Sequence, residues 1–191
     1  PKDKFRQPYI ARQVRVTIPV HLAPLSWASF QLVKGQVDHR DGIYQNGVID
    51  TPFVTVSVDE GITVYDKTTN EAYEDFIQFE DRGDIGNEYI YFQPKGTEPI
   101  YAQLKGYEVL ENNARYAKIL LKHDLTIPVS ADEKLDAEQR GIIEFMKRDA
   151  GRSEELTTIP LETEMTVFVD NPQIRFKTRF TNTAKDHRIR L

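Results

Sequence analysis

The sequence predicts an all-β fold, an antiparallel β-sandwich with one inserted helix. Apolar and polar residues alternate along many short segments, and short polar turns join these segments. A sheet with one apolar face buries that face against a second layer, and a chain of 191 residues that is 39% hydrophobic can fill one such core. We therefore expect residues 1–191 to form a single domain.

The expected strands share a period-two alternation. They span residues 14–20, 30–33, 53–58, 62–65, 76–79, 101–110, 114–129, 165–169, 174–180 and 187–191. Asp59-Glu60-Gly61 predicts a hairpin between the third and fourth strands, because glycine accepts the positive φ of such turns. The polar turn at 111–113 predicts a long hairpin, and the last three strands are interpreted as a meander.

One helix is expected between sandwich strands, from about Ala131 to Ala150. Ser130 and Glu133 have the spacing of a capping box, and Gly151 is a candidate for its end. Helical spacing gives an apolar stripe of Leu135, Ile142, Ile143 and Met146, and the surface pairs Asp136/Arg140 and Glu144/Arg148. We favour a helix that covers one edge of the sheet over a helix that binds a partner.

Composition argues against several classes of function. The chain has no cysteine, which rules out disulfides and thiolate zinc sites and fits a reducing, cytoplasmic location. A net charge of −5 without a basic stripe argues against nucleic acid as a partner. No apolar run approaches the ~18 residues of a membrane span and no signal peptide is found, so we expect no membrane contact. The missing initial Met and the final H-R-I-R-L, an unfinished strand, predict a domain cut from a longer protein.

Histidines offer no catalytic or metal-binding arrangement. The four, His21, His39, His123 and His187, are scattered, and none has a partner at the i, i+4 spacing that places two on one helix face. We expect hydrogen-bonded structural roles, with His187 in polar packing at a strand end. No G-x-S-x-G nucleophile motif occurs. The sequence therefore predicts no catalytic residue and no metal site in this chain.

Residues 79–94, F-E-D-R-G-D-I-G-N-E-Y-I-Y-F-Q-P, combine the groups that bind a sugar. Glycines permit sharp turns, acids and an amide suit hydroxyls, and aromatic rings suit C–H faces. A purely local interpretation is also open. Asp and Asn beside glycine form Asx-turns, and a tyrosine on a sandwich strand often belongs to the core.

This stretch resembles the acidic F-E-D-x-G-D-x-G-D-x-Y-x-Y loop in the large β-domain of glycoside hydrolase family 38 α-mannosidases, with Asn87 in place of the third acid. Residues 51–69 resemble the family's hairpin with its D-K-x-T-G-like turn, where Asn70 replaces glycine. Residues 159–168 and 174–191 resemble the closing strands, and N-T-A-K-D-H-R-I-R is the most specific match. The resemblance implies a sandwich of the mutarotase-like or super-sandwich type.

The resemblance implies a non-catalytic part of a retaining, zinc-dependent α-mannosidase that hydrolyses terminal α-mannosides in mannose metabolism. Family members bind zinc in an α/β catalytic domain, through H-x-D-x-x-W-like and H-H-D-like motifs that this sequence lacks. We therefore expect no cofactor here, zinc in the parent's catalytic domain, and no activity of the fragment alone. The expected partners are α-mannosides and the intramolecular catalytic domain, and a homo-oligomer stays open.

The family's β-domain also supplies a tyrosine and other residues that complete the pocket around bound mannose. Tyr89 is the first candidate and Tyr91 the rival, since strand geometry would send both to the same side. Asp84 and Asn87 would either bond sugar hydroxyls or brace the loop. Two alternatives remain, a stand-alone carbohydrate-binding module and a purely structural or oligomerisation sandwich. In the structural case the loop would pack against its own domain.

Overall fold

The structure, a computed structural model, describes residues 16, 18, 20–35 and 41–191. The chain divides into two units, Pro1–Asp38 and His39–Leu191, which are described separately. Among the described residues, no helix is long and apolar enough to cross a membrane.

The described residues of the first unit form no strand. The strand expected at residues 30–33 is therefore wrong, as is the one at 14–20 for its described residues, while Val14 lies outside them. An alternating pattern becomes a strand only where a neighbouring chain accepts its backbone hydrogen bonds. None of the described residues of this unit pairs in a sheet, and Trp27 and Leu32 are 84% and 91% exposed.

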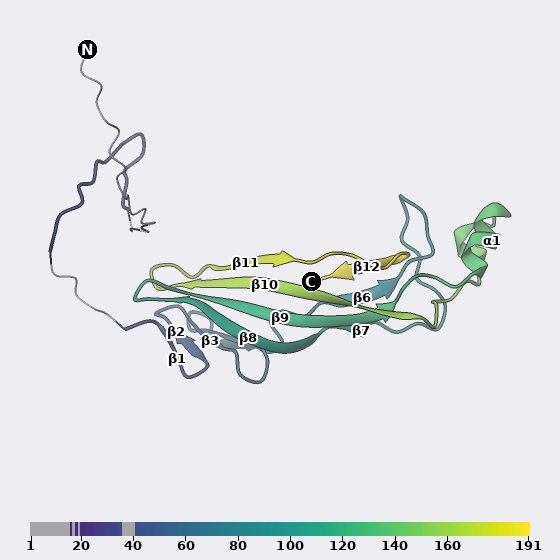
Figure 1. Ribbon diagram of the computed structural model, residues 1–191, viewed down its shortest axis with the longest axis horizontal. Coiled ribbons are helices and arrows are strands. Elements are labelled where there is room, and N and C mark those ends of the chain that lie inside the picture. Colours follow the sequence, from purple (N-terminus) through teal and green to yellow (C-terminus); the bar gives the residue numbers. More distant parts are fainter. Residues whose placement is uncertain (1–15, 17, 19, 36–40) are drawn as a thin grey trace, which may run out of the picture. The chain divides into compact units, whose positions relative to one another are not determined.

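The second unit contains three antiparallel sheets (Figure 1). The first has five strands in chain order: β1 Tyr44–Gln45, β2 Val48–Asp50, β3 Val54–Ser57, β4 Thr63–Asp66 and β5 Glu71–Tyr73. The second has the order β11-β10-β9-β8, with β8 Gln103–Asn112, β9 Tyr116–Pro128, β10 Leu156–Phe168 and β11 Ile174–Arg179. The third has the order β12-β6-β7, with β6 Glu80–Gly83, β7 Ile100–Tyr101 and β12 His187–Arg190.

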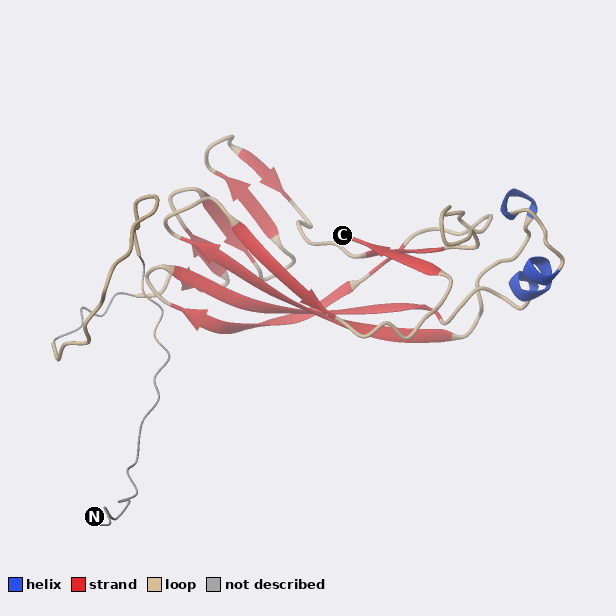
Figure 2. Cartoon of the chain, turned by 90° about the horizontal axis from the view of Figure 1, so that it is seen from above, coloured by secondary structure: helices blue, strands red, loops and turns tan. Residues whose placement is uncertain are grey.

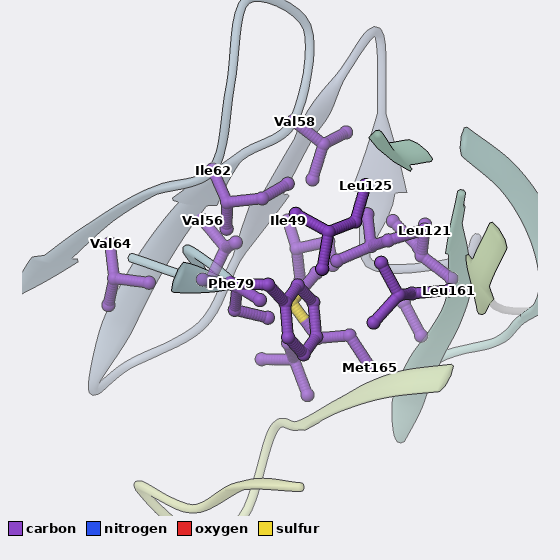
Figure 3. Packing of buried hydrophobic residues seen from close by; sticks show 14 of the residues in the cluster. Ile49, Val56, Val58, Ile62, Val64, Phe79, Leu121, Leu125, Leu161 and Met165 are labelled. Atoms are coloured by element: carbon purple, nitrogen blue, oxygen red, sulfur yellow. The ribbon is translucent and has the colours of Figure 1, made fainter. Parts of the chain in front are cut away.

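The first two sheets pack face to face around one hydrophobic core (Figure 3). Alternate residues of β9 and β10, such as Ile119, Leu121, Leu161 and Met165, are fully buried against Ile49 and other residues of the first sheet. Each such side chain contributes about 1.5–3 kcal/mol by leaving water. Charged residues lie at positions between the buried ones. Lys122 of β9, for example, forms an exposed ion pair with Glu108 of β8, with the two charged groups 3.2 Å apart. The expected all-β sandwich is confirmed.

Both expected hairpins are confirmed, because β3 pairs with β4 and β8 pairs with β9. In the second unit, two further strand predictions are wrong. Residues 76–79 form no strand, and the strand begins instead at Glu80, inside the stretch expected to be a loop. The last strand, β12, does not continue a meander but pairs with β6, from Arg190 opposite Glu80 to His187 opposite Gly83. Long-range pairing of this kind leaves no trace in the local alternation.

The expected helix over Ala131–Ala150 is too long. α1 spans only Lys134–Arg140, and a 3-10 turn, η1, follows at Phe145–Lys147. The N-cap residue, Glu133, makes no side-chain cap hydrogen bond, so the capping box is wrong: Ser130 Oγ donates to the Ala131 carbonyl instead. The helix ends at Arg140 and not at Gly151, and Ile142, with a φ of 56°, leaves the helical conformation.

The apolar stripe and one surface pair of that helix therefore do not form. Only Leu135 of the stripe is buried, while Ile142, Ile143 and Met146 are 91%, 40% and 57% exposed. The Asp136/Arg140 pair forms at 3.8 Å, but Glu144 pairs with Lys147. In Figures 1 and 2 α1 lies beyond the strand ends, so it does not cover a sheet edge with its stripe. Its packing partner is the acidic loop.

Candidate functional site

The acidic stretch starts from a buried charge centre. Asp81, on β6, has a fully buried side chain that pairs with Arg152 Nη1 through Oδ2 at 2.6 Å and with His187 Nδ1 through Oδ1 at 2.6 Å. The other ring nitrogen of His187 faces Asn182 Oδ1 at 3.0 Å. This confirms the structural role expected for His187. It also joins the two motifs that carry the family resemblance, which sequence reasoning did not foresee.

The Arg152 side chain, which pairs with Asp81, lies close to both ends of the loop. A Cβ placed on Gly83 would meet Arg152 Cδ at 3.0 Å and Pro94 Cγ at 3.0 Å. Gly83 precedes the loop and Pro94 ends it, so a side chain at position 83 would press on both Arg152 and the end of the loop. Pro94 is buried as well. The base of the loop is thus fixed to the sandwich.

Asp84 and Asn87 brace the loop from within. Asp84 Oδ1 accepts hydrogen bonds from the backbone N–H of Gly86 at 2.9 Å and of Phe92 at 3.1 Å. Asn87 Oδ1 accepts from Tyr89 N–H and Ile90 N–H, both at 2.9 Å. These Asx-type contacts match the bracing alternative for these oxygens. They leave the second carboxylate oxygen of Asp84 and the amide nitrogen of Asn87 for other contacts.

The two candidate tyrosines have different surroundings. Neither lies in a strand, so the reason for expecting both on the same side does not hold. Tyr89 is 87% exposed, and within the described part of the chain its hydroxyl has no hydrogen-bond partner. Tyr91 is half-buried under Arg188, whose Cζ lies 3.7 Å from the ring centroid, and its hydroxyl donates to Gln93 Oε1 at 3.3 Å.

A hollow of about 340 Å³ opens on one side of the loop. Its lining is polar and includes three acids: Asp84, Gly86, Asn87, Glu88, Gln139, Asp186 and His187. Asp84 and Asn87 thus lie together at this hollow, and Tyr89 and Tyr91 do not line it. Carboxylates and amides of this kind suit the hydroxyl groups of a ligand.

The helical insert, residues 131–151, packs against the loop, and its Gln139 lines the same hollow. Ile85 forms a small buried cluster with Ala131, Leu135 and Ala150, and Phe92 packs against it. The Phe92 ring also meets Phe145 edge to face, with centroids 5.6 Å apart. Sequence reasoning missed this contact because it assigned the apolar side chains of the insert to a sheet edge.

No metal site is present among the described residues, since no three His, Asp or Glu side chains gather there. His123 is buried in the sandwich with its ring edge against Phe79, 5.4 Å between centroids, and burial lowers the pKa of its imidazole. His187 is held by Asp81 and Asn182. His21 is exposed, and His39 lies outside the described residues. The described residues therefore do not fit the zinc ion implied by the family resemblance.

A second charge cluster ties β6 to β12. Glu80 accepts hydrogen bonds from Arg82 Nε at 2.7 Å and from Arg190 Nε at 3.1 Å. The hydrogen bond with Arg82, which has the larger effect, and the hydrogen bond with Arg190 lower the pKa of Glu80 to about 2. Its carboxylate is therefore charged at neutral pH. It acts as an anchor between strands and not as a proton donor.

Comparison with known proteins shows what the chain is similar to. The model of the glycosyl hydrolases family 38 C-terminal domain 1 matches residues 1–34. The chain is 31% identical to a "Putative mannosylglycerate hydrolase" of Halalkalibacterium halodurans, over 100% of the chain and 22% of that protein.

Two solved structures are also similar to the chain. An alpha-mannosidase from Enterococcus faecalis matches 77% of the chain with a TM-score of 0.73 and 33% identity, over 17% of its own length. A glycosyl hydrolase family 38 protein from the same organism matches 81% with a TM-score of 0.76 and 32% identity, over 19% of its length. The chain thus spans about a fifth of the length of the proteins that it matches.

Proposed function

We propose that this chain, a C-terminal fragment of a glycoside hydrolase family 38 protein, is a non-catalytic sandwich that completes the carbohydrate pocket of a glycosidase for α-mannosides. The names of two relatives given above, "Putative mannosylglycerate hydrolase" and alpha-mannosidase, both refer to mannose. In this proposal the sandwich supports the catalytic domain and presents the loop Asp84–Tyr91 to the bound sugar.

The observation that carries the proposal is the contrast within the loop. Its base and its carboxylates are held by buried ion pairs and by backbone hydrogen bonds. At its tip, the Asn87 side chain holds the backbone of Tyr89 by a hydrogen bond, while the Tyr89 side chain is 87% exposed to solvent. A large aromatic side chain held in solvent by a braced loop is the arrangement of a preorganised contact.

Each group at the loop has a chemical task in the proposed pocket. The Tyr89 ring offers an apolar face for sugar C–H groups, and its hydroxyl can donate to or accept from a sugar hydroxyl. The Glu88 carboxylate is an acceptor, and the Asn87 amide nitrogen is a donor. Asp84 and Tyr91 serve the loop, since their contacts with backbone, Arg188 and Gln93 are already made.

Catalysis belongs to residues outside the chain in this proposal. A zinc ion held by a catalytic domain would supply electrophilic chemistry in the parent, which we propose to be a retaining enzyme, and the described residues form no group that could hold the ion. What this chain does is orient the sugar and exclude water on one side of the pocket. The lack of cysteine supports a cytoplasmic parent.

A purely structural sandwich is the second candidate. The buried half of the stretch, which includes Phe79, Asp81 and Ile85, favours it because these residues serve the fold. The two candidates differ at the tip. A structural sandwich gains nothing from an exposed Tyr89, whereas a pocket-completing domain requires it.

Titration of the isolated chain with mannosides separates these functions from a stand-alone carbohydrate-binding module. A domain that supplies one side of a pocket should bind an α-mannoside only weakly, with Kd above ~1 mM, and should not turn over p-nitrophenyl α-mannoside. Micromolar binding by the chain alone would favour the module instead. Turnover that copurifies with the folded chain would overturn the assignment of catalysis to other residues.

A further inference from the structure

The helical insert makes polar as well as apolar contacts with the acidic loop, through Arg148. Arg148 Nη1 donates hydrogen bonds to the carbonyl of Ile85, at 2.5 Å, and to that of Gly86, at 2.8 Å. Its Nε donates to the carbonyl of Ile143 within the insert, at 3.2 Å. One guanidinium therefore connects the backbone of the insert to the backbone of the loop. Bonds from a charged donor to two adjacent carbonyls are stronger than neutral ones and fix direction.

The insert that carries Arg148 is itself firmly held. Asp132 N–H donates to the carbonyl of Gly151 and Asp132 Oδ2 accepts from Gly151 N–H, both at 3.0 Å, which closes the insert at its base. Glu138 accepts from the N–H groups of Asp149 and Ala150, at 2.7 and 3.3 Å. These contacts fix the backbone that follows Arg148. The arginine thus extends from a rigid element.

The loop, by contrast, is rigid within itself but has few direct bonds to the sandwich. Its internal bonds run from the N–H of Ile85 to Phe92 O and from the N–H of Asn87 to Ile90 O. Beyond its base, it meets the sandwich through the N–H of Asp84, which donates to Asp186 O at 2.8 Å, and through the Tyr91 ring, which lies against Arg188. The carbonyls of Ile85 and Gly86, the next two in the chain, are those that Arg148 holds.

We propose that Arg148 is a positioning residue, which sets the direction in which the loop presents Tyr89. This inference rests on the proposed function of the loop, and it assigns the insert a task that its sequence pattern does not suggest. Arg148 touches no proposed sugar contact itself. It acts through the backbone of Ile85 and Gly86, while the Phe145–Phe92 contact closes the same interface on its apolar side.

Arg148→Met in the full-length protein tests this, because methionine keeps the aliphatic stem and removes every donor. Lys147→Met is the matched control, since the Lys147 side chain is 75% exposed and, among the described residues, pairs only with Glu144. Hydrogen exchange should rise about tenfold or more in the peptide covering residues 84–92, and not in β9. kcat/KM for p-nitrophenyl α-mannoside should fall about three- to tenfold in the same variant. Arg148→Lys, which keeps one charged donor, should recover part of both effects.

Combination with Tyr89→Phe separates the inference from the proposed function. If Arg148 acts by positioning Tyr89, the double variant should lose less activity than the sum of the single losses. If Tyr89→Phe alone is without effect, while Arg148→Met loosens the loop and lowers kcat/KM, Tyr89 is not the contact but the positioning role stands. Unchanged exchange at residues 84–92 in a folded Arg148→Met protein overturns the inference. So does faster exchange with kcat/KM equal to that of Lys147→Met.

Discussion

Asp81 and His187 are separated by 106 positions in sequence, yet Asp81 Oδ1 and His187 Nδ1 lie 2.6 Å apart in a fully buried contact. Arg152 occupies the other carboxylate oxygen at 2.6 Å. One carboxylate therefore joins β6, β12 and the segment that leaves the helical insert. The base of the acidic loop depends on this single side chain.

Asp81→Asn should destabilise the folded chain by about 3–5 kcal/mol, because it leaves the Arg152 guanidinium buried without its countercharge. Asp149→Asn is the control, since Asp149 pairs with Lys95 at the surface and its loss should cost about 0–1 kcal/mol. Urea unfolding of the two variants gives both values. Equal stabilities would show that the buried centre does not hold the fold.

Gly86→Ala should disrupt the loop while the sandwich stays folded. An added Cβ would lie 1.8 Å from the Ile90 carbonyl oxygen, so the loop backbone must move. We expect faster hydrogen exchange at residues 84–92 and a loss of about tenfold or more in kcat/KM of the full-length protein. Gly96→Ala, where no atom lies within 4 Å of the added Cβ, introduces only strain from a φ of 69°. Similar activity losses in both variants would contradict this account.

Stability should fall on mild acidification because of His123. Burial lowers the pKa of His123, so the unfolded chain binds a proton more readily than the folded one. Its contribution is fully present above the ordinary value of 6.5 and is lost as the pH falls through that value toward the lower folded one. The urea midpoint should therefore decrease between about pH 7.5 and 5.5. His123→Leu should remove part of the decrease, and a variant that keeps all of it would contradict the prediction.

The local sequence pattern was enough to predict the two hairpins, but it was not enough to predict the third sheet, β12-β6-β7. Alternation and Gly61 locate β3 and β4, since both depend on neighbours in sequence. The pairing of β12 with β6 depends on residues far apart, and Asp81 looked like a loop acid because its partners Arg152 and His187 are distant. The helix was overestimated because Gly141 and Ile142 interrupt a pattern that otherwise continues.

The sequence was enough to predict which stretch forms the candidate site, but not which role each of its residues has. The sequence identified the stretch 79–94 and left open that its Asp and Asn side chains brace the loop. In the structure, Asp84 and Asn87 do accept hydrogen bonds from the loop backbone. The sequence did not separate Tyr89 from Tyr91, because the difference is made by Arg188, which covers Tyr91 from another strand. Nor did it identify Arg148, whose bonds go to backbone carbonyls and carry no sequence pattern.

Substitution of Tyr89 by phenylalanine in the full-length protein tests most directly whether the loop presents a sugar contact. A neutral hydrogen bond from a phenol is worth roughly 0.5–1.5 kcal/mol, so kcat/KM for p-nitrophenyl α-mannoside should fall about three- to tenfold. The Tm should stay nearly unchanged, because Tyr89 is 87% exposed. Tyr91→Phe is the control and should leave kcat/KM nearly intact, since its hydroxyl already bonds Gln93. A Tyr89→Phe protein with unchanged kcat/KM and a stability lowered by more than ~1.5 kcal/mol would show instead that the hydroxyl serves the fold.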